Sequence, residues 1–401
     1  MLGMGDKKIL KFSIITISFT VLMLVLSTGA IPVSASSTLV VDDDGMAVAG
    51  DCDSTTAADS STIQGAVDAA IAGDTIIVCD GTYGKVNIPS GKDGLTIEAS
   101  SKPIIDCAGT TGGASVGNGV TIASNGVSIR DLEIRFCDNG IQGTSISSTV
   151  IRNNNIHDNK NPVGGFGGVG IAFNGDSDSN TVRNNQIRQN DRQGIFLGGS
   201  CTPPEATSSD LNVISNNVIV DNGQDLATAL PDASQYGIQL CAADNNVISH
   251  NTIKEHNTWG FGIGIYLFDS NDNVVSHNNL NKNRQGIVLF GVSTGNMIED
   301  NNVKNGIAPV FTFNFAATGI RVFDSASSGN TFINNLVKNN ADDGFKLVSS
   351  SNTLTKNKSQ NNGGFGFSDD AVTGNVYTSN RCNGNTAGGS SVPGAWCKPQ
   401  A

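Results

Sequence analysis

The chain has 401 residues and a net charge of −12, with 6% aromatic residues, 15% charged residues and 48 glycines. This acidic balance argues against a nucleic-acid partner, because phosphate binding needs clustered lysines and arginines. Val, Ile and Leu recur at short intervals along the whole chain, a distribution that disordered segments lack. The composition therefore predicts many short strands separated by turns.

Residues 1–35 have the organisation of a signal peptide. A basic segment, an apolar segment and a small-residue cleavage site follow one another: Lys7, Lys8 and Lys11, then residues 12–26, then Val33-Ser34-Ala35. An uncleaved membrane anchor is the alternative, since the apolar run is long enough to span a bilayer. Either alternative places residues 36–401 outside the cytoplasm, secreted or at the cell surface, and gives no other segment that contacts a membrane.

Residues 61–72 carry apolar side chains at helical spacing, with Ser60 or Ser61 as the expected N-cap. A helix here would cover the open edge of the first element that follows, which would otherwise be free to pair with another chain. We expect a second cap over residues 383–401, near Trp396.

An asparagine-containing repeat organises the rest of the chain. Its rule is Asn-x-apolar-x-x-Asn-x-apolar, usually followed three residues later by another Asn and then by Gly-apolar-x-apolar. The second Asn of the rule recurs every 22 to 34 residues: Asn154, Asn185, Asn217, Asn251, Asn278, Asn301, Asn335, Asn357 and Asn380. Insertions into loops account for the longer intervals.

Each repeat predicts one coil of three short strands, with alternating residues inward and coils stacked about 4.8 Å apart. An inward Asn at each turn can bond to the backbone and to the equivalent Asn of neighbouring coils. Residues 36–401 are thus expected to form one all-β domain, a right-handed parallel β-helix of about ten or more coils with an N-terminal capping helix. We expect it to be a monomer.

Eight cysteines in an exported chain predict disulfides. Position along the repeat suggests three pairs: Cys52 with Cys79, Cys201 with Cys241, and Cys382 with Cys397. Cys107 and Cys137 remain. Spacing alone leaves the connectivity open, because eight cysteines allow 105 pairings.

The run from Ser61 to Tyr83 resembles the opening of pectin-lyase-like parallel β-helix proteins, and the Asn-rich coils resemble NosD-type repeats. The resemblance covers roughly residues 38–395. It implies the β-helix fold and an exported protein, and within such proteins it implies carbohydrate binding, sugar cleavage or a role in assembling copper enzymes. It is specific for fold and weak for activity.

The Gly-apolar-x-apolar strand of each coil predicts one exterior face. Its outward positions are Phe196, Gln239, Tyr266, Val288, Arg321 and Lys346, followed two residues later by Phe268, Phe290 and Phe323 in three of the coils. Sugar rings stack on aromatic faces and carboxylates pair with Arg and Lys. We therefore expect Tyr266, Phe268, Phe290, Phe323, Lys346 and Gln239 to bind a polysaccharide or cell-surface glycan. The alternative is that a loop or a terminal segment packs over these rings.

Insertions at residues 160–169, 223–236, 256–263 and 306–318 all leave the same turn beside this strand. Loops gathered on one edge of a solenoid often build its binding face. Drift of surface loops is the alternative explanation.

Catalytic candidates follow from the same face. Asp269 and Asp324 come directly after Phe268 and Phe323, and together with Arg321 they are the predicted acid and base groups. Asp342-Asp343 and Asp369-Asp370 are further acidic pairs near turns. An enzyme of this kind would be a polysaccharide lyase, a glycoside hydrolase or an epimerase, and Ca²⁺ held by carboxylates is the one cofactor that such chemistry suggests. No motif of polygalacturonases or alginate epimerases is present, so the sequence leaves binding and catalysis both open.

His250 and His277 occupy one repeat position and should stack outward on adjacent coils, away from the aromatic residues. Surface histidines at a turn are the simplest interpretation, and a metal pair is the alternative. Two further functions remain: a non-catalytic, rod-like cell-surface protein, and a NosD-like accessory factor for copper enzymes. Beyond residue 35 the chain has only Met46 and Met297 and no Cys-Met-His cluster, which argues against copper delivery.

Overall fold

A computed structural model describes residues 36–43, 52, 58–99, 101–109, 113–160, 162, 167–199, 201, 208–223, 235–257, 261–308, 316–370, 374–391 and 396–399. The described residues all belong to one unit of the chain, Ser36–Ala401. The predicted signal peptide, residues 1–35, lies outside the described residues. Within the described ranges, no helix is long and apolar enough to cross a membrane.

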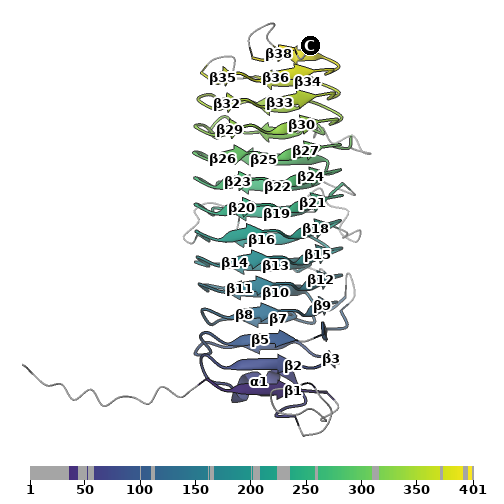
Figure 1. Cartoon of the computed structure of the whole chain (residues 1–401), viewed down its shortest axis with the longest axis vertical. Coiled ribbons are helices and arrows are strands. Elements are labelled where there is room, and N and C mark those ends of the chain that lie inside the picture. The colour runs from purple at the N-terminus through teal and green to yellow at the C-terminus, as the bar shows by residue number, and fades with distance from the viewer. Residues whose placement is uncertain are drawn as a thin grey trace, which may run out of the picture. The chain divides into compact units, whose positions relative to one another are not determined.

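Residues 36–401 form a parallel β-helix, as predicted (Figure 1). Three long parallel sheets run the length of the stack, and a typical coil contributes one strand to each. The strands are short because a turn follows after about three residues, and each pairs with strands of the coils before and after it.

The first sheet has thirteen strands. They are β1 (Thr38–Val41), β2 (Thr75–Val78), β5 (Thr96–Ala99), β8 (Ser128–Arg130), β11 (Val150–Arg152), β14 (Thr181–Arg183), β17 (Val213–Ser215), β20 (Val247–Ser249), β23 (Val274–Ser276), β26 (Met297–Glu299), β29 (Thr331–Ile333), β32 (Thr353–Thr355) and β35 (Val376–Thr378).

The second sheet also has thirteen strands. They are β3 (Thr82–Tyr83), β6 (Ile104–Asp106), β9 (Glu133–Arg135), β12 (Asn155–His157), β15 (Gln186–Arg188), β18 (Val218–Val220), β21 (Thr252–Lys254), β24 (Asn279–Asn281), β27 (Asn302–Lys304), β30 (Leu336–Lys338), β33 (Lys358–Gln360), β36 (Arg381–Asn383) and β38 (Lys398–Pro399).

The third sheet has twelve strands. They are β4 (Val86–Ile88), β7 (Val120–Ile122), β10 (Asn139–Thr144), β13 (Val169–Asn174), β16 (Ile195–Gly198), β19 (Tyr236–Cys241), β22 (Ile263–Phe268), β25 (Gln285–Phe290), β28 (Ile320–Val322), β31 (Phe345–Leu347), β34 (Phe365–Asp369) and β37 (Gly388–Ser390).

The interior is filled by the inward residue of each short strand. In the second sheet these are aliphatic side chains stacked coil on coil, such as Ile187, Ile219 and Ile253, all fully buried. Because the strand period is two, the residues on either side of each inward residue point outward. The exterior of each sheet is therefore the surface on which function can be built.

Asparagine side chains form ladders inside the turns. The backbone N–H of Asn278 donates to Oδ1 of Asn301 at 3.0 Å, and Nδ2 of Asn301 donates to the carbonyl of Val275 at 2.8 Å. The nine Asn residues of the predicted ladder, from Asn154 to Asn380, are linked in this way. They lie between the first and second sheets and satisfy buried backbone groups at every coil.

Two more ladders accompany this one. The first Asn of the repeat forms a ladder that enters the first sheet, as in the bond from the Asn212 N–H to Asn246 Oδ1 at 2.8 Å. The trailing Asn forms a third ladder, between the second and third sheets, as in the bond from the Asn159 N–H to Asn190 Oδ1 at 3.2 Å.

The third ladder departs from asparagine at two coils. His256 takes the place of Asn, is fully buried, and lies 3.2 Å from Asn222 Nδ2 through Nε2 and 3.0 Å from Asn283 Oδ1 through Nδ1. Gly306 takes the second place, and its backbone N–H donates to Asn340 Oδ1 at 2.9 Å. A neutral ring with its proton on Nδ1 satisfies both neighbours of His256.

The glycine that precedes each strand of the third sheet allows close packing of the coils. A Cβ on Gly264 would lie 2.6 Å from Cδ2 of Leu280 and 2.8 Å from the carbonyl oxygen of Gly286 in the next coil. A side chain at this position would therefore push neighbouring coils apart.

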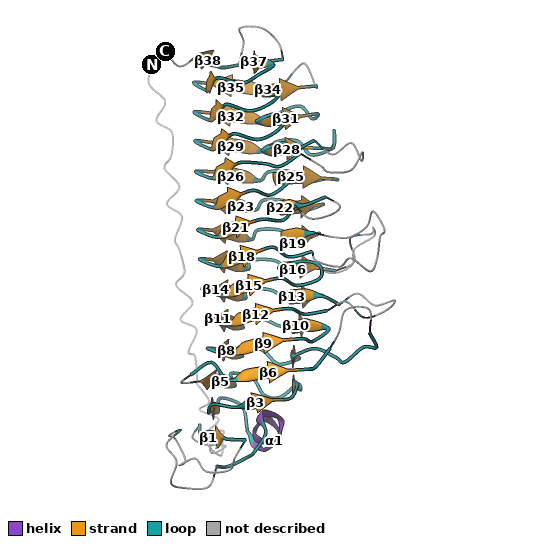
Figure 2. Ribbon diagram, turned by 90° about the vertical axis from the view of Figure 1, so that its right-hand side faces the viewer, coloured by secondary structure: helices purple, strands orange, loops and turns teal. Residues whose placement is uncertain are grey.

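The N-terminal end is covered by α1 (Ile63–Ala69), which buries Ile63, Ala66 and Val67 (Figure 2). The helix is shorter than predicted, and its N-cap is Thr62 rather than Ser60 or Ser61. The reason is local: the Thr62 side chain accepts the N–H of Gly65, whereas the Ser60 hydroxyl bonds to Thr62 itself.

Four disulfides join Cys52–Cys79, Cys107–Cys137, Cys201–Cys241 and Cys382–Cys397. The three expected pairs are confirmed, and the two remaining cysteines pair with each other. At the C-terminal end Trp396 stacks on Tyr377, with ring centroids 4.9 Å apart, beside Cys382–Cys397.

Candidate functional site

The outer face of the third sheet carries the predicted binding residues in register. Hydrogen-bonded pairing places Gln239 beside Tyr266, Tyr266 beside Val288, Val288 beside Arg321, and Arg321 beside Lys346. Each is flanked by inward residues, as Tyr266 is by the fully buried Ile265 and Leu267. The repeat therefore aligns these side chains in one column.

Aromatic rings form a continuous row on this face, which we call the aromatic row: Tyr236, Tyr266, Phe268, Phe290 and Phe323. Tyr236 and Tyr266 have ring centroids 4.9 Å apart, Phe268 and Phe290 stack at 5.4 Å, and Phe290 meets Phe323 at 5.1 Å. Burial raises the pKa of Tyr266 above its ordinary value. Tyr236 is buried, whereas the other four rings remain partly exposed.

Two members of the predicted column lie below the accessible surface. Gln239 is 5% exposed, and its amide bonds to Gln193 at 2.7 Å and to the sulfurs of Cys201 and Cys241 at 3.2 and 3.3 Å. Val288 is 2% exposed and packs with Tyr236 and Ile263. Gln239 therefore packs beneath the surface of this face, against the Cys201–Cys241 disulfide.

Charged residues gather at the C-terminal end of the aromatic row: Arg321, Lys346, Asp342, Asp343 and Asp370, which we call the charged cluster. The guanidinium of Arg321 lies over the Phe323 ring, with its central carbon 4.1 Å from the centroid. Lys346 lies 3.6 Å from Asp370. The sequence identified Arg321 and Lys346 here, but gave Asp342 and Asp343 only as an acidic pair near a turn.

Asp343 is 6% exposed, and its carboxyl group accepts the N–H of Phe365 at 2.6 Å. Burial raises its pKa above the ordinary value, and the neighbouring Asp342 adds to this, while the Phe365 hydrogen bond and Lys346 lower it. A carboxyl group whose affinity for a proton is raised by burial has the property required of a general acid.

Asp269 and Asp324, the acid and base predicted from sequence, lie at the turn that leaves the third sheet. Asp269 accepts the N–H of Val292 at 2.6 Å through its side chain, and Asp324 accepts the N–H of Ala326 at 3.2 Å. These contacts stabilise turns. Their catalytic role stays a prediction, whereas the acidic groups that lie near Arg321 are Asp342, Asp343 and Asp370.

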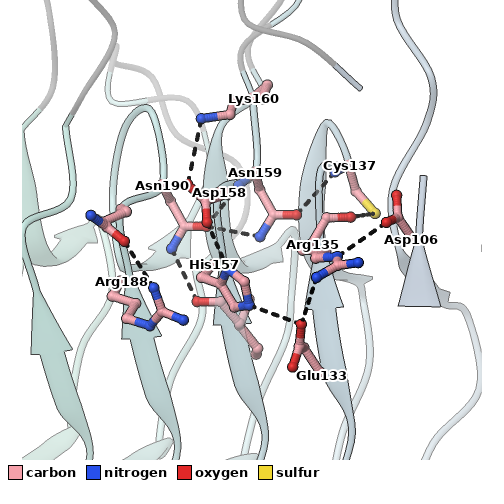
Figure 3. Close-up of polar contacts among 12 residues, drawn as sticks. Asp106, Glu133, Arg135, Cys137, His157, Asp158, Asn159, Lys160, Arg188 and Asn190 are labelled. Carbon is pink, nitrogen blue, oxygen red and sulfur yellow. Dashed lines mark hydrogen bonds and ion pairs between the residues drawn. The ribbon is translucent and has the colours of Figure 1, made fainter. Parts of the chain in front are cut away.

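A second charged network lies on the outer face of the second sheet (Figure 3). His157 lies between two carboxylates, 3.3 Å from Glu133 and 2.7 Å from Asp158. Arg135 joins Glu133 to Asp106, at 3.2 and 3.0 Å. The residues of this network come from β6, β9 and β12 and the turn after β12, so their contacts hold three neighbouring coils together. The repeat did not single it out, because its residues vary from coil to coil.

His250 and His277 stack as predicted, with ring centroids 4.8 Å apart and planes 6° from parallel. Nε2 of His277 lies 3.8 Å from Asp300 in the next coil. Both residues adopt a left-handed backbone conformation, with φ of 57° and 56°, at the turn between the first and second sheets. They are therefore remote in the coil from the aromatic row.

Solved structures of similar fold include the complex of XylC with xylose, with 13% identity, a TM-score of 0.59, and coverage of 90% of this chain and 84% of that one. The A-module of the mannuronan C-5 epimerase AlgE4 of Azotobacter vinelandii has 13% identity, a TM-score of 0.54, and coverage of 84% and 95%. The surface adhesin PfbA of Streptococcus pneumoniae has 12% identity, a TM-score of 0.55, and coverage of 83% and 89%. At these identities the likeness shows the fold alone.

No curated protein sequence matches the chain. One family model does, under the description "Periplasmic copper-binding protein (NosD)", and it covers residues 67–311, from α1 to the coil that carries Gly306. That segment is more than half of the sequence and contains most of the Asn ladders, so the chain belongs to the NosD family of parallel β-helix proteins.

Proposed function

We propose that this protein is exported and binds a polysaccharide along the outer face of its third sheet. The observation that carries the proposal is the aromatic row. Its rings come from successive coils, spaced by about 4.8 Å in a parallel sheet, and four of them remain partly exposed. The exposed parts of rings repeated from coil to coil offer apolar surface to consecutive sugar rings in an extended chain.

Two further observations support export and a glycan ligand. Four disulfides suit an oxidising compartment outside the cytoplasm, in agreement with the periplasmic family description. Among the proteins of similar fold, one is bound to xylose, one is a mannuronan C-5 epimerase and one is a surface adhesin. Sheets of this kind therefore serve both binding and catalysis in other proteins.

Catalysis by the same face is the second candidate, and Asp343 favours it. Its buried carboxyl lies in a cluster with Arg321 and Lys346, at the end of the surface where the glycan would lie. A lyase, a hydrolase or an epimerase would each need such a proton donor or acceptor. Incubation with bound glycans, with and without Ca²⁺, followed by reducing-end and unsaturated-product assays, tests this candidate.

Copper, which the family description names, fits the donor set of this chain poorly. All eight cysteines are in disulfides, so no thiolate is available. The lone pairs of His250 and His277 lie in nearly parallel ring planes and run side by side rather than converging on one ion. Across the described ranges, no group of three or more His, Cys, Asp or Glu side chains could hold a metal ion.

A glycan array that includes neutral and acidic polysaccharides tests the proposed function. The double variant Phe290→Ala, Phe323→Ala should lower the affinity for a bound glycan by about tenfold or more, because two stacking surfaces are lost. Phe136→Ala is the matched control, since that ring lies at the end of β9 beside Arg135, next to the second sheet. Unchanged affinity in the double variant, or absence of any glycan ligand, would refute the proposal.

A further inference from the structure

The guanidinium of Arg321 has hydrogen-bonding capacity that the described residues do not use. Its Nε and Nη1 atoms are buried, yet neither makes a hydrogen bond with any residue that the structure describes. One face of the group is covered by the ring of Phe323 at 4.1 Å. Two buried donors without partners are costly, so a ligand group that reaches them would offset that cost.

The neighbouring carboxylates have other partners. Asp370 lies 3.6 Å from Lys346, Asp342 accepts the Thr318 hydroxyl at 3.3 Å, and Asp343 accepts the N–H of Phe365. Burial lowers the pKa of Arg321, and the nearby Asp342, Asp370 and Asp343 oppose this. An arginine stays protonated in this setting. The aromatic row thus ends at a partly buried guanidinium, close to three carboxylates, with two donors that have no partner among the described residues.

We infer that Arg321 binds an anionic group, a carboxylate or a sulfate, carried by a sugar that stacks on Phe290 and Phe323, so that the glycan is acidic. This inference rests on the proposed function and names its ligand class. Guanidinium groups form strong charge-assisted hydrogen bonds with such anions. A hydroxyl of a neutral sugar would fill the same donors without offsetting the buried charge.

The overall charge of −12 opposes the approach of a polyanion, so recognition must come from contacts at the cluster itself. Lys346 provides a second positive charge one coil further along the column, in register with Arg321. If one anionic sugar lies at these two residues and the adjacent sugars lie over the aromatic row, the glycan runs parallel to the axis of the β-helix. Binding should weaken with added salt, although less than for a fully exposed pair.

The test compares polymers that differ only in charge. The full chain is titrated with polygalacturonate and with the same polymer after methyl esterification of its carboxylates, and in parallel with a sulfated galactan and its desulfated form. We expect at least one anionic polymer to bind about tenfold more tightly than its neutral counterpart. Arg321→Gln should abolish that preference.

Arg188→Gln is the matched control, because Arg188 lies on the outer face of the second sheet and bonds to Gln189 (Figure 3). It removes the same charge and should keep the preference for the anionic polymer. Arg321→Lys, which keeps the charge with fewer donors, should keep part of it, and an unchanged circular dichroism spectrum and melting midpoint show that each variant is folded.

The outcomes separate the two proposals. Equal affinity for charged and neutral forms in both pairs of polymers, or a preference that survives Arg321→Gln, overturns this inference and leaves glycan binding intact. Absence of binding to all four polymers overturns this inference, and absence of any ligand in the glycan array as well overturns the proposed function with it.

Discussion

Replacing His256 with asparagine should remove a loss of stability that the wild-type chain undergoes on acidification. His256 occupies an Asn position of the third ladder and is fully buried between Asn222 and Asn283. Burial lowers its pKa from 6.5 to about 4, against a smaller opposing effect of the Asn283 hydrogen bond. A protonated ring would also present an N–H to the Nδ2 donor of Asn222, where it now accepts.

The magnitude follows from proton linkage. Above pH 6.5 the imidazole of His256 is neutral in the folded and the unfolded chain, so it adds no pH dependence. Between pH 6.5 and about 4 the unfolded chain binds a proton that the folded chain does not, and the free energy of unfolding falls as the pH falls. Below pH 4 both states are protonated and the loss is complete. A lowering from 6.5 to about 4 corresponds to a loss of about 3 kcal/mol.

Denaturant unfolding at pH 7.5, 5.5 and 4.0, with the disulfides intact, measures this effect in the wild type and in His256→Asn. The variant restores the residue that the ladder has at Asn190, Asn222 and Asn283, so we expect little change at pH 7.5. The difference between the two proteins should grow by about 3 kcal/mol toward pH 4, because all other titrating groups are common to both. Parallel pH profiles would refute the assignment of a neutral, buried His256.

Three further substitutions test the construction of the coils. Asn301→Ala should lower the free energy of unfolding by about 3 kcal/mol, because the N–H of Asn278 and the carbonyl of Val275 lose their partners. Asn302→Ala, at an outward position, is the control. Equal effects of the two substitutions would contradict a stabilising role of the Asn ladder. Gly264→Ala should lower the free energy of unfolding by about 2 kcal/mol, because the new Cβ would meet the carbonyl oxygen of Gly286. Gly84→Ala is the control, because a Cβ there meets no atom within 4 Å, and it should have little effect. Removing the Cys382–Cys397 disulfide, whose cysteines are 15 residues apart, by replacing both with serine should lower the free energy of unfolding measured by chemical denaturation by about 3 kcal/mol. No change would show that the last coil takes no part in cooperative unfolding.

The fold could be predicted from sequence because its signal recurs in every coil. Packing requires three residue types at fixed places in each coil: the ladder Asn, the inward aliphatic residue and the glycine before the third strand. An error in aligning the repeat at one coil is therefore corrected by the next coil. The same regularity fixed the outward column from Gln239 to Lys346, which the strand register reproduces. Cap geometry was less predictable: Thr62, rather than a neighbouring serine, caps α1 because of one local hydrogen bond.

The site was only partly predictable, since chemistry on the outer face does not repeat. Alignment of the repeat identified the rings of the aromatic row from Tyr266 to Phe323, but it could not show that Gln239 is covered by the Cys201–Cys241 disulfide. It also favoured Asp269 and Asp324, which follow aromatic residues directly. The burial of Asp343 depends on neighbouring coils, so the sequence pattern of a single coil does not predict it.

Departures from the repeat are therefore more informative about function than the repeat itself. Both departures of the third ladder, His256 and Gly306, precede strands that carry the candidate site: β22 with Tyr266 and Phe268, and β28 with Arg321. Each is also followed by an insertion before the next strand begins. An insertion does not itself require the loss of this Asn, since Asn159 and Asn222 are also followed by insertions and keep their ladder bonds. Because the insertions do not explain the two replacements, we place the functional constraint on this part of the third sheet.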